Sequence, residues 1–205
     1  LLILLRAQRC YNKEIAGAGF SPANLSKGAW NHTMQNEHPV LGILGGLGPM
    51  STVYFYQMLT EHTPAQCDQD HLDIVISSRA STPDRTAYIL GESEDDPFAQ
   101  MERDAEMLVK YGATILAIPC NTSHYFLDRV QEQISIPILH MIRETAKLLK
   151  AQGKSRPGIL ATDGTIQSGL YQKAFAALGI QAAVPSPAAQ KPVMSLIYDH
   201  IKAGQ

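Results

Sequence analysis

The chain has 205 residues, which suits one domain or two small lobes that share an interface. Its 17 Lys and Arg against 19 Asp and Glu give a formal net charge of −2, so no basic excess favours nucleic acid or an anionic membrane. No stretch approaches the roughly 18 apolar residues of a membrane-spanning helix. Three scattered cysteines, Cys10, Cys67 and Cys120, do not make a disulfide framework or a structural zinc site. We therefore expect a soluble, cytoplasmic α/β protein without a bound metal.

The N-terminal residues 1–33 differ from the rest because they show no sustained helical or strand period. Their opening apolar run, residues 1–5, is shorter than the roughly 7–15 apolar residues of a signal peptide. We predict that Met34 is the natural start and that residues 1–33 are an extraneous or disordered leader.

From Val40 onward, short apolar runs alternate with segments of helical period, which is typical of βα units on a parallel sheet. We predict strands at 40–45, 73–78, 114–119 and 136–140, and helices at 50–61, 97–111, 123–134 and 142–151. After a polar stretch the cycle restarts, with strands at 158–161 and 180–184 and helices at 166–178 and 192–203. This restart indicates two lobes of similar design. In such sheets the ligand binds outside the carboxyl ends of the strands, so the strand-to-helix loops are the candidate site.

The first of these loops is rich in glycine. Gly46 and Gly48 match the first two glycines of a Gly-x-Gly-x-x-Gly motif, but Ser51 stands at the third position. No acidic residue ends the second strand to bind a ribose, so a dinucleotide site is disfavoured. Two interpretations stay open: a tight turn that needs glycine, or a small anion pocket formed by N–H groups at a helix start.

The loop from Pro119 to His124 carries the strongest chemical signal. Cys120 follows an apolar strand and precedes a helix that we expect Thr122 or Ser123 to cap. A thiol there feels the positive end of the helix dipole, which favours a reactive thiolate over the buried, inert role of most free cysteines. His124 is either the base of a Cys/His pair or a structural residue of the helix start, and its spacing favours the structural role.

Three further residues indicate a binding site only when they are considered together. Arg85 follows the second strand, and its forked guanidinium suits a carboxylate, although a lone loop arginine is more often solvated. Tyr198 and Lys202, four residues apart, share one face of the last predicted helix, where an ordinary surface pair is the alternative. The loop at 162–165 also follows a predicted strand, so all these loops converge on one edge.

Four motifs in this order resemble the cofactor-independent aspartate/glutamate racemase superfamily, and most closely its aspartate racemase branch. They are Leu44-Gly45-Gly46-Leu47-Gly48-Pro49, Pro83-Asp84-Arg85-Thr86, Pro119-Cys120-Asn121-Thr122-Ser123-His124 and Leu160-Ala161-Thr162-Asp163-Gly164-Thr165. The resemblance runs from about residue 40 to residue 205. It implies two Rossmann-like α/β lobes with the active site between them, here a first lobe at 34–152 and a partial second lobe at 153–205, in a homodimer.

The resemblance also implies a mechanism without pyridoxal phosphate or metal. One cysteine thiolate removes the α-proton of an acidic amino acid, aspartate or glutamate, and a second cysteine delivers a proton to the opposite face. Carried over, Cys120 is the first cysteine, while Arg85 and Lys202 bind substrate carboxylates and Tyr198 lines the pocket. Further hydrogen bonds to the substrate would come from Asn121, Thr122, Ser123, Gly46, Leu47 and Gly48.

The sequence departs from this family pattern at one point. The second cysteine belongs to a Gly-Cys-Thr strand end of the second lobe, which the 205 residues do not include. We therefore expect either a fragment of a racemase or a relative with a single base, with an incomplete second sheet whose edge is exposed. The alternatives are another enzyme of the superfamily acting at an α-carbon (a hydantoin racemase, maleate isomerase or decarboxylase), a cysteine hydrolase that uses Cys120 and His124, and a non-catalytic small-molecule binding lobe.

Overall fold

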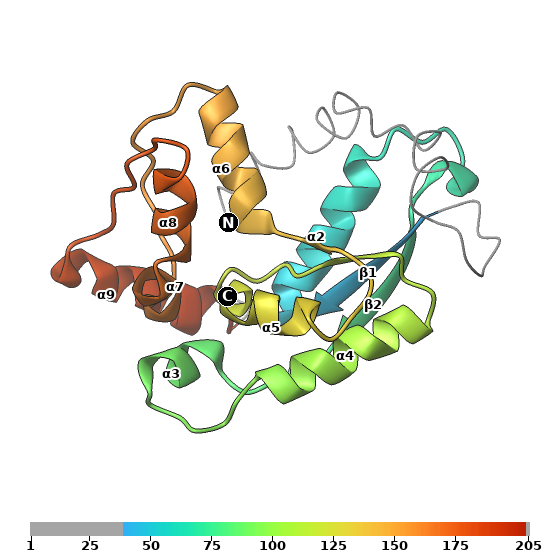
Figure 1. The fold of residues 1–205 in the computed structure, drawn as a ribbon, viewed down its shortest axis with the longest axis horizontal. Coiled ribbons are helices and arrows are strands. Elements are labelled where there is room, and N and C mark those ends of the chain that lie inside the picture. The colour runs from blue at the N-terminus through green and yellow to red at the C-terminus, as the bar shows by residue number, and fades with distance from the viewer. Residues whose placement is uncertain (1–38, 204–205) are drawn as a thin grey trace.

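The computed structural model describes residues 39–203, so the predicted leader and Met34 lie outside the described residues. Its centre is a parallel sheet in the order β2-β1-β3-β4 (Figure 1). The strands are β1 (Val40–Gly45), β2 (Asp73–Ser78), β3 (Ile115–Ala117) and β4 (Ile138–Leu139). This confirms the predicted α/β class with a parallel sheet, although β3 and β4 are shorter than predicted.

Helices cover both faces of this sheet. The helical elements along residues 49–131 are α2 (Pro49–His62), the 3₁₀ turn η2 (Asp68–Asp70), α3 (Arg85–Leu90), α4 (Phe98–Lys110), the 3₁₀ helix η3 (Thr122–Phe126) and α5 (Leu127–Gln131), of which α2 and α4 contact the strands. Figure 1 shows α2 and α4 on opposite sides of the strands. The sequence analysis missed α3, whose start is capped by the Asp84 carboxylate accepting from the Ala87 N–H at 2.9 Å. The predicted helix at 123–134 is η3 followed by the short α5.

Alternation along β1 divides the apolar side chains between the two faces. Leu41 and Ile43 pack with Leu59 of α2 on one face. Leu44 packs on the other face, in a larger core that includes Met101 of α4. This larger core extends to Phe126 of η3, which is fully buried. The loop after β3 therefore packs against this buried apolar core.

A second core forms beside the sheet. It joins α6 (Met141–Ala151), α7 (Asp163–Ser168) and α8 (Leu170–Ala176), and the chain continues through α9 (Pro187–Ser195) into the π-helix η4 (Leu196–Ile201). Its buried members are Ile142, Ala146, Ile159, Ala161, Tyr171, Phe175 and Ile180. We call residues 39–140 the sheet region and residues 141–203 the helical region. Figure 1 shows α6 to α9 gathered on the side of the molecule away from β2.

The predicted strands at 158–161 and 180–184 are wrong for the helical region. Its described residues contain one isolated parallel bridge, Gly158 with Ala183, instead of a second sheet. The Ile159 N–H donates to the Ala183 carbonyl at 2.8 Å, but Pro157 and Pro185 lack the N–H groups that would extend the ladder.

The helices of this region also differ from prediction. The segment at 166–178 is divided into α7 and α8 by Gly169, which adopts φ +66°. The last helix begins at Pro187 rather than Pro192, because the Ser186 hydroxyl caps it by accepting from the Ala189 N–H. Along residues 39–203 every helix is too short or too polar to cross a bilayer.

Candidate active site

The two glycines of the turn after β1 have different structural roles. Gly46 adopts φ +79°, and a Cβ added there would lie 2.2 Å from the backbone nitrogen of Arg79. Its N–H donates to the Thr52 hydroxyl at 2.9 Å. Gly48 has φ −112°, and a Cβ added there would meet nothing within 4 Å. The fold therefore requires glycine at Gly46, whereas Gly48 keeps a space open at the start of α2.

Arg85 is buried, with 7% of its surface exposed, unlike a solvated loop arginine. Its Nη1 donates to the carbonyls of Thr82 at 3.0 Å and Pro83 at 2.8 Å, and its Nη2 donates to the Leu47 carbonyl at 3.0 Å. Of the five N–H bonds of a guanidinium, these contacts use three. The buried Nε has no partner among residues 39–203. Arg85 thus ties its loop to the glycine turn and keeps donors for a further acceptor.

Cys120 lies half-buried beyond the carboxyl end of β3. The predicted cap by Thr122 or Ser123 is wrong, because η3 begins at Thr122 and Asn121 occupies the cap position without a side-chain cap bond. The Ser123 hydroxyl is fully buried and has no partner in the described part of the chain. The thiol therefore precedes a 3₁₀ helix of five residues rather than the longer helix that the sequence predicts.

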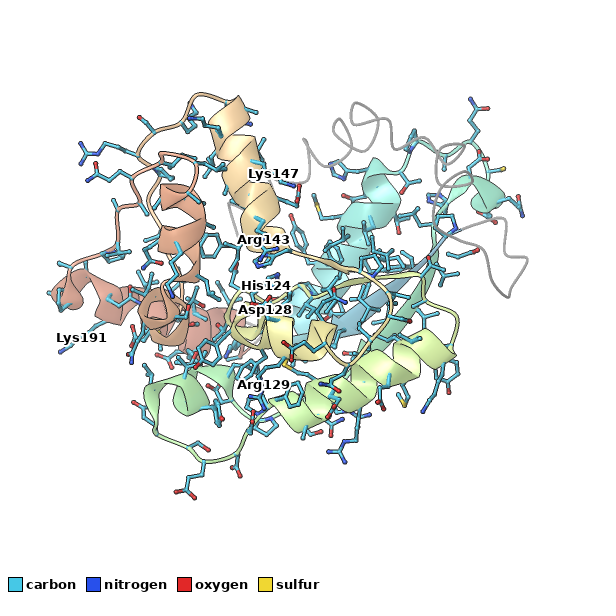
Figure 2. The ribbon with its side chains drawn as sticks, in the orientation of Figure 1. His124, Asp128, Arg129, Arg143, Lys147 and Lys191 are labelled. Atoms are coloured by element: carbon cyan, nitrogen blue, oxygen red, sulfur yellow. The ribbon has the colours of Figure 1, made fainter. Side chains whose placement is uncertain are left out.

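His124 holds the backbone of this loop. Its Nε2 accepts from the Met141 N–H at 3.2 Å, so its Nδ1 carries the proton and donates to the Cys120 carbonyl at 2.9 Å. Burial lowers the pKa of His124 to about 4, and the His140 ring 5.2 Å away adds to this shift. Figure 2 shows His124 at the start of α6. Both ring nitrogens contact the backbone, which favours the structural role over the base of a Cys/His pair.

Three buried threonine hydroxyls join the two regions. The Thr122 hydroxyl lies 2.9 Å from those of Thr162 and Thr165, which lie 3.1 Å from each other. Each of these side chains is at most 8% exposed. A closed triangle lets every hydroxyl donate once and accept once, so none is left unpaired. Thr122 is therefore anchored to α7 and does not point freely toward a ligand.

Asn121 makes a second contact across the same boundary. The Tyr171 hydroxyl of α8 donates to the Asn121 Oδ1. Tyr171 is 3% exposed, whereas Asn121 is half-buried. The carboxamide next to Cys120 is thus held by the core of the helical region.

Tyr198 and Lys202 meet as the helical spacing predicts, with the Lys202 Nζ 3.8 Å from the centre of the Tyr198 ring. Both contact Asp84, the neighbour of Arg85, at 3.1 Å from the Tyr198 hydroxyl and 3.5 Å from the Lys202 Nζ. Burial raises the pKa of Asp84, but the Ala87 N–H and the Lys202 ammonium outweigh it and hold that pKa below its usual value. Lys202 therefore lies beside the Arg85 loop, paired with a carboxylate of the protein.

The elements that carry these residues pack together. α3, α7 and η3 contact one another, and Figure 1 shows α3 beside α7. Gly164 of α7 comes so close to Thr86 that a Cβ would lie 2.9 Å from the Thr86 Cα. The sequence analysis gave no role to Asp84 or Tyr171. Asp84 stood inside a quoted motif, whereas Tyr171 gave no signal within its helical pattern.

Cys67 lies away from this site. It is exposed and precedes β2, so it belongs to the amino ends of the parallel strands, whereas Cys120 follows the carboxyl end of β3. Residues 39–203 hold no group of three or more His, Cys, Asp or Glu that could bind a metal ion.

Comparison with known proteins identifies the family. The model of the Asp/Glu/Hydantoin racemase family matches residues 44–205. The broad specificity amino-acid racemase RacX of Bacillus subtilis is 34% identical over 139 residues, which cover 65% of this chain and 59% of RacX. A glutamate racemase of Lactiplantibacillus plantarum is 29% identical over 131 residues, which cover 58% of this chain and 48% of that protein. The chain thus spans between 48% and 59% of the length of these relatives.

Solved structures agree with this assignment. The aspartate racemase of Picrophilus torridus superposes with a TM-score of 0.72 at 31% identity, covering 81% of this chain and 69% of that one. A putative Asp/Glu racemase from Yersinia pestis superposes with a TM-score of 0.69 at 26% identity, covering 81% of this chain and 73% of that one. Both share the parallel α/β fold described above. The chain belongs to the Asp/Glu/hydantoin racemase family.

Proposed function

We propose that this chain carries the proton-transfer site of a cofactor-independent amino-acid racemase acting on aspartate. The observation that supports it most is the convergence of the loops after β1, β2 and β3 with α7 and η4. Arg85 is bonded to the glycine turn and begins α3, which packs against η3, the element that Cys120 precedes, while Lys202 contacts Asp84 of the Arg85 loop. Two cations on loops that pack around the element behind a thiol suit a dicarboxylic amino acid.

In the proposed reaction the Cys120 thiolate removes the α-proton. The Cα–H bond breaks, an S–H bond forms, and the electron pair spreads into the α-carboxylate. Positive charge fixed near that carboxylate stabilises the developing charge, and we assign this role to the Arg85 guanidinium, which the Thr82 and Leu47 carbonyls hold in place. Lys202 exchanges Asp84 for the second carboxylate of the substrate. Asn121 and the N–H groups of Leu47 and Gly48 offer further donors, whereas the Gly46 N–H is bonded to Thr52 and the Ser123 hydroxyl is fully buried. Thr122 anchors the loop, and Tyr198 lines the pocket.

Inversion also needs a proton donor on the opposite face of Cα. Among residues 39–203, Cys120 is the one thiol at this edge of the sheet, since Cys67 lies at the other edge. We propose that the 205-residue chain exchanges the α-proton of one enantiomer, and that inversion requires the second cysteine implied by the family resemblance.

The cysteine hydrolase alternative receives no support from the geometry of His124. A base for Cys120 needs a free ring nitrogen, and both nitrogens of His124 contact the backbone. The homodimer implied by the resemblance and the cytoplasmic location expected from the composition are part of our proposal. Sedimentation over a range of protein concentrations tests the homodimer.

The test follows the α-proton of L- and D-aspartate and of L- and D-glutamate in deuterated water by proton NMR. We expect one enantiomer of aspartate to lose its α-proton signal without inversion, and Cys120→Ser to slow this exchange by about 100-fold or more. Cys67→Ser is the matched control and should exchange like the unmodified chain. Absence of exchange would leave a non-catalytic binding protein. Fast inversion would contradict the single-thiol part of the proposal.

A further inference from the structure

The hydrogen bond between Tyr171 and Asn121 lies one residue from the proposed catalytic thiol. It joins α8 of the helical region to the loop of the sheet region, across 50 positions of sequence. Asn121 is half-buried at the cap position of η3, while Tyr171 is 3% exposed. A buried side chain of one region thus contacts a polar side chain of the other.

Tyr171 is held rigidly and remains a hydrogen-bond donor. Its ring packs edge-on against Phe175, with the ring centres 5.5 Å apart at 71°. Burial raises the pKa of the Tyr171 phenol far above its usual value, and the nearby Thr145 hydroxyl offsets only part of this. The phenol therefore keeps its proton at neutral pH and can donate it to Asn121.

The donated proton fixes the polarity of the Asn121 carboxamide. With its oxygen toward Tyr171, the NH₂ group must point away from α8. That NH₂ group has no partner within residues 39–203. It carries two donors, and a carboxylate is a suitable acceptor for them.

We propose that Tyr171 is a positioning residue, which orients the Asn121 amide so that its NH₂ group faces the substrate carboxylate beside Cys120. This inference rests on the proposed function. Without the phenol proton, the amide can rotate and present its oxygen to the carboxylate, which repels it. Tyr171 therefore acts through Asn121 and does not itself touch the substrate.

The rest of the loop is held by other contacts. Thr122 is fixed by the hydroxyls of Thr162 and Thr165, and the Cys120 carbonyl is fixed by His124. Removing the Tyr171 hydroxyl should therefore release the Asn121 side chain while the backbone around Cys120 stays in place. Tyr171→Phe keeps the ring and its packing against Phe175, so the fold should survive.

A double-mutant cycle tests this dependence in the α-proton exchange assay. We expect Tyr171→Phe to lower kcat/KM about 10- to 100-fold, as for the loss of a hydrogen bond to a charged group. In an Asn121→Ala background the same change should have no further effect, because the residue through which it acts is gone. Tyr125→Phe is the control, since it removes an exposed hydroxyl from η3 itself. Equal losses in both backgrounds would overturn the proposal.

The side-chain NH₂ signal of Asn121 in nitrogen-15 NMR gives a readout that does not need activity. The signal is identified by its absence from Asn121→Ala. We expect it to shift in Tyr171→Phe and to stay in place in Tyr125→Phe, and an unshifted signal in Tyr171→Phe would overturn the proposal. If the unmodified chain shows no exchange, the proposed function fails, while a shifted signal would still support the orienting role of Tyr171.

Discussion

The sheet region and the helical region are both well packed, but different forces hold them. Each contains a fully buried phenylalanine, Phe126 in the first and Phe175 in the second. The sheet region is tied by a continuous parallel ladder, whereas the described residues of the helical region share one bridge. The helical region reaches the site through polar side chains such as Thr165 and Tyr171. The first region thus presents the candidate reactive loops, and the second orients them.

The largest expected effect is the loss of stability when a buried phenylalanine is removed from either core. Phe126→Ala and Phe175→Ala should each cost about 3–5 kcal/mol of unfolding free energy, because each leaves a large cavity. Hydrogen exchange of the native state should distinguish them. We expect Phe126→Ala to lower amide protection throughout residues 39–203, because the helical region is too small to be stable alone.

Phe175→Ala should lower amide protection in residues 141–203 only, since the sheet region retains its own core. Phe98→Ala, which removes a partly buried ring at the edge of the first core, provides a milder comparison. Equal loss of protection in both regions for Phe175→Ala would mean that the two regions open as one unit.

The second expected effect is a loss of stability at low pH. The pKa of His124 falls from 6.5 to about 4 on folding, so the unfolded chain binds more protons between these pH values. Neutral His124 therefore makes its full contribution to the unfolding free energy above pH 6.5. As the pH falls toward 4, the unfolding free energy decreases progressively, by about 3 kcal/mol. His140, whose pKa is also lowered by burial, adds a contribution of the same sign.

Urea unfolding at several pH values measures this loss. His124→Gln keeps an amide that can contact the backbone but does not titrate, so its stability should vary much less between pH 6.5 and 4. An unchanged slope in this variant would assign the acid sensitivity to other groups.

A third prediction compares the two glycines of the turn. Gly46→Ala should cost about 2 kcal/mol or more, because φ +79° is strained for alanine and its Cβ would overlap the Arg79 backbone. Gly48→Ala should leave the unfolding free energy unchanged or raise it by up to about 1 kcal/mol. If substrate occupies the space beside Gly48, this variant should raise KM for aspartate. An unchanged KM would mean that the space is not used.

The sequence predicted the elements whose signals are local. The bounds of β1 and β2 follow from apolar runs with polar ends, and both agree with the structure. The strands at 158–161 and 180–184 gave the same local signal but lack a continuous partner, which no local pattern reveals. The polar contacts of the site were equally hidden, since Thr122 lies 40 positions from Thr162.

The smallest expected effect belongs to Lys202. Its pair with Asp84 is long, at 3.5 Å, and both side chains are partly exposed, at 29% and 38%. Pairs of this kind contribute about 0–1 kcal/mol and weaken with salt, so Lys202→Met should barely change the unfolding free energy. Lys147→Met, which breaks the exposed pair with Glu144, should change the unfolding free energy as little as Lys202→Met does. Only Lys202→Met should raise KM for aspartate, because a weak internal partner lets Lys202 exchange Asp84 for a substrate carboxylate at little cost. A large loss of stability would instead make the pair structural.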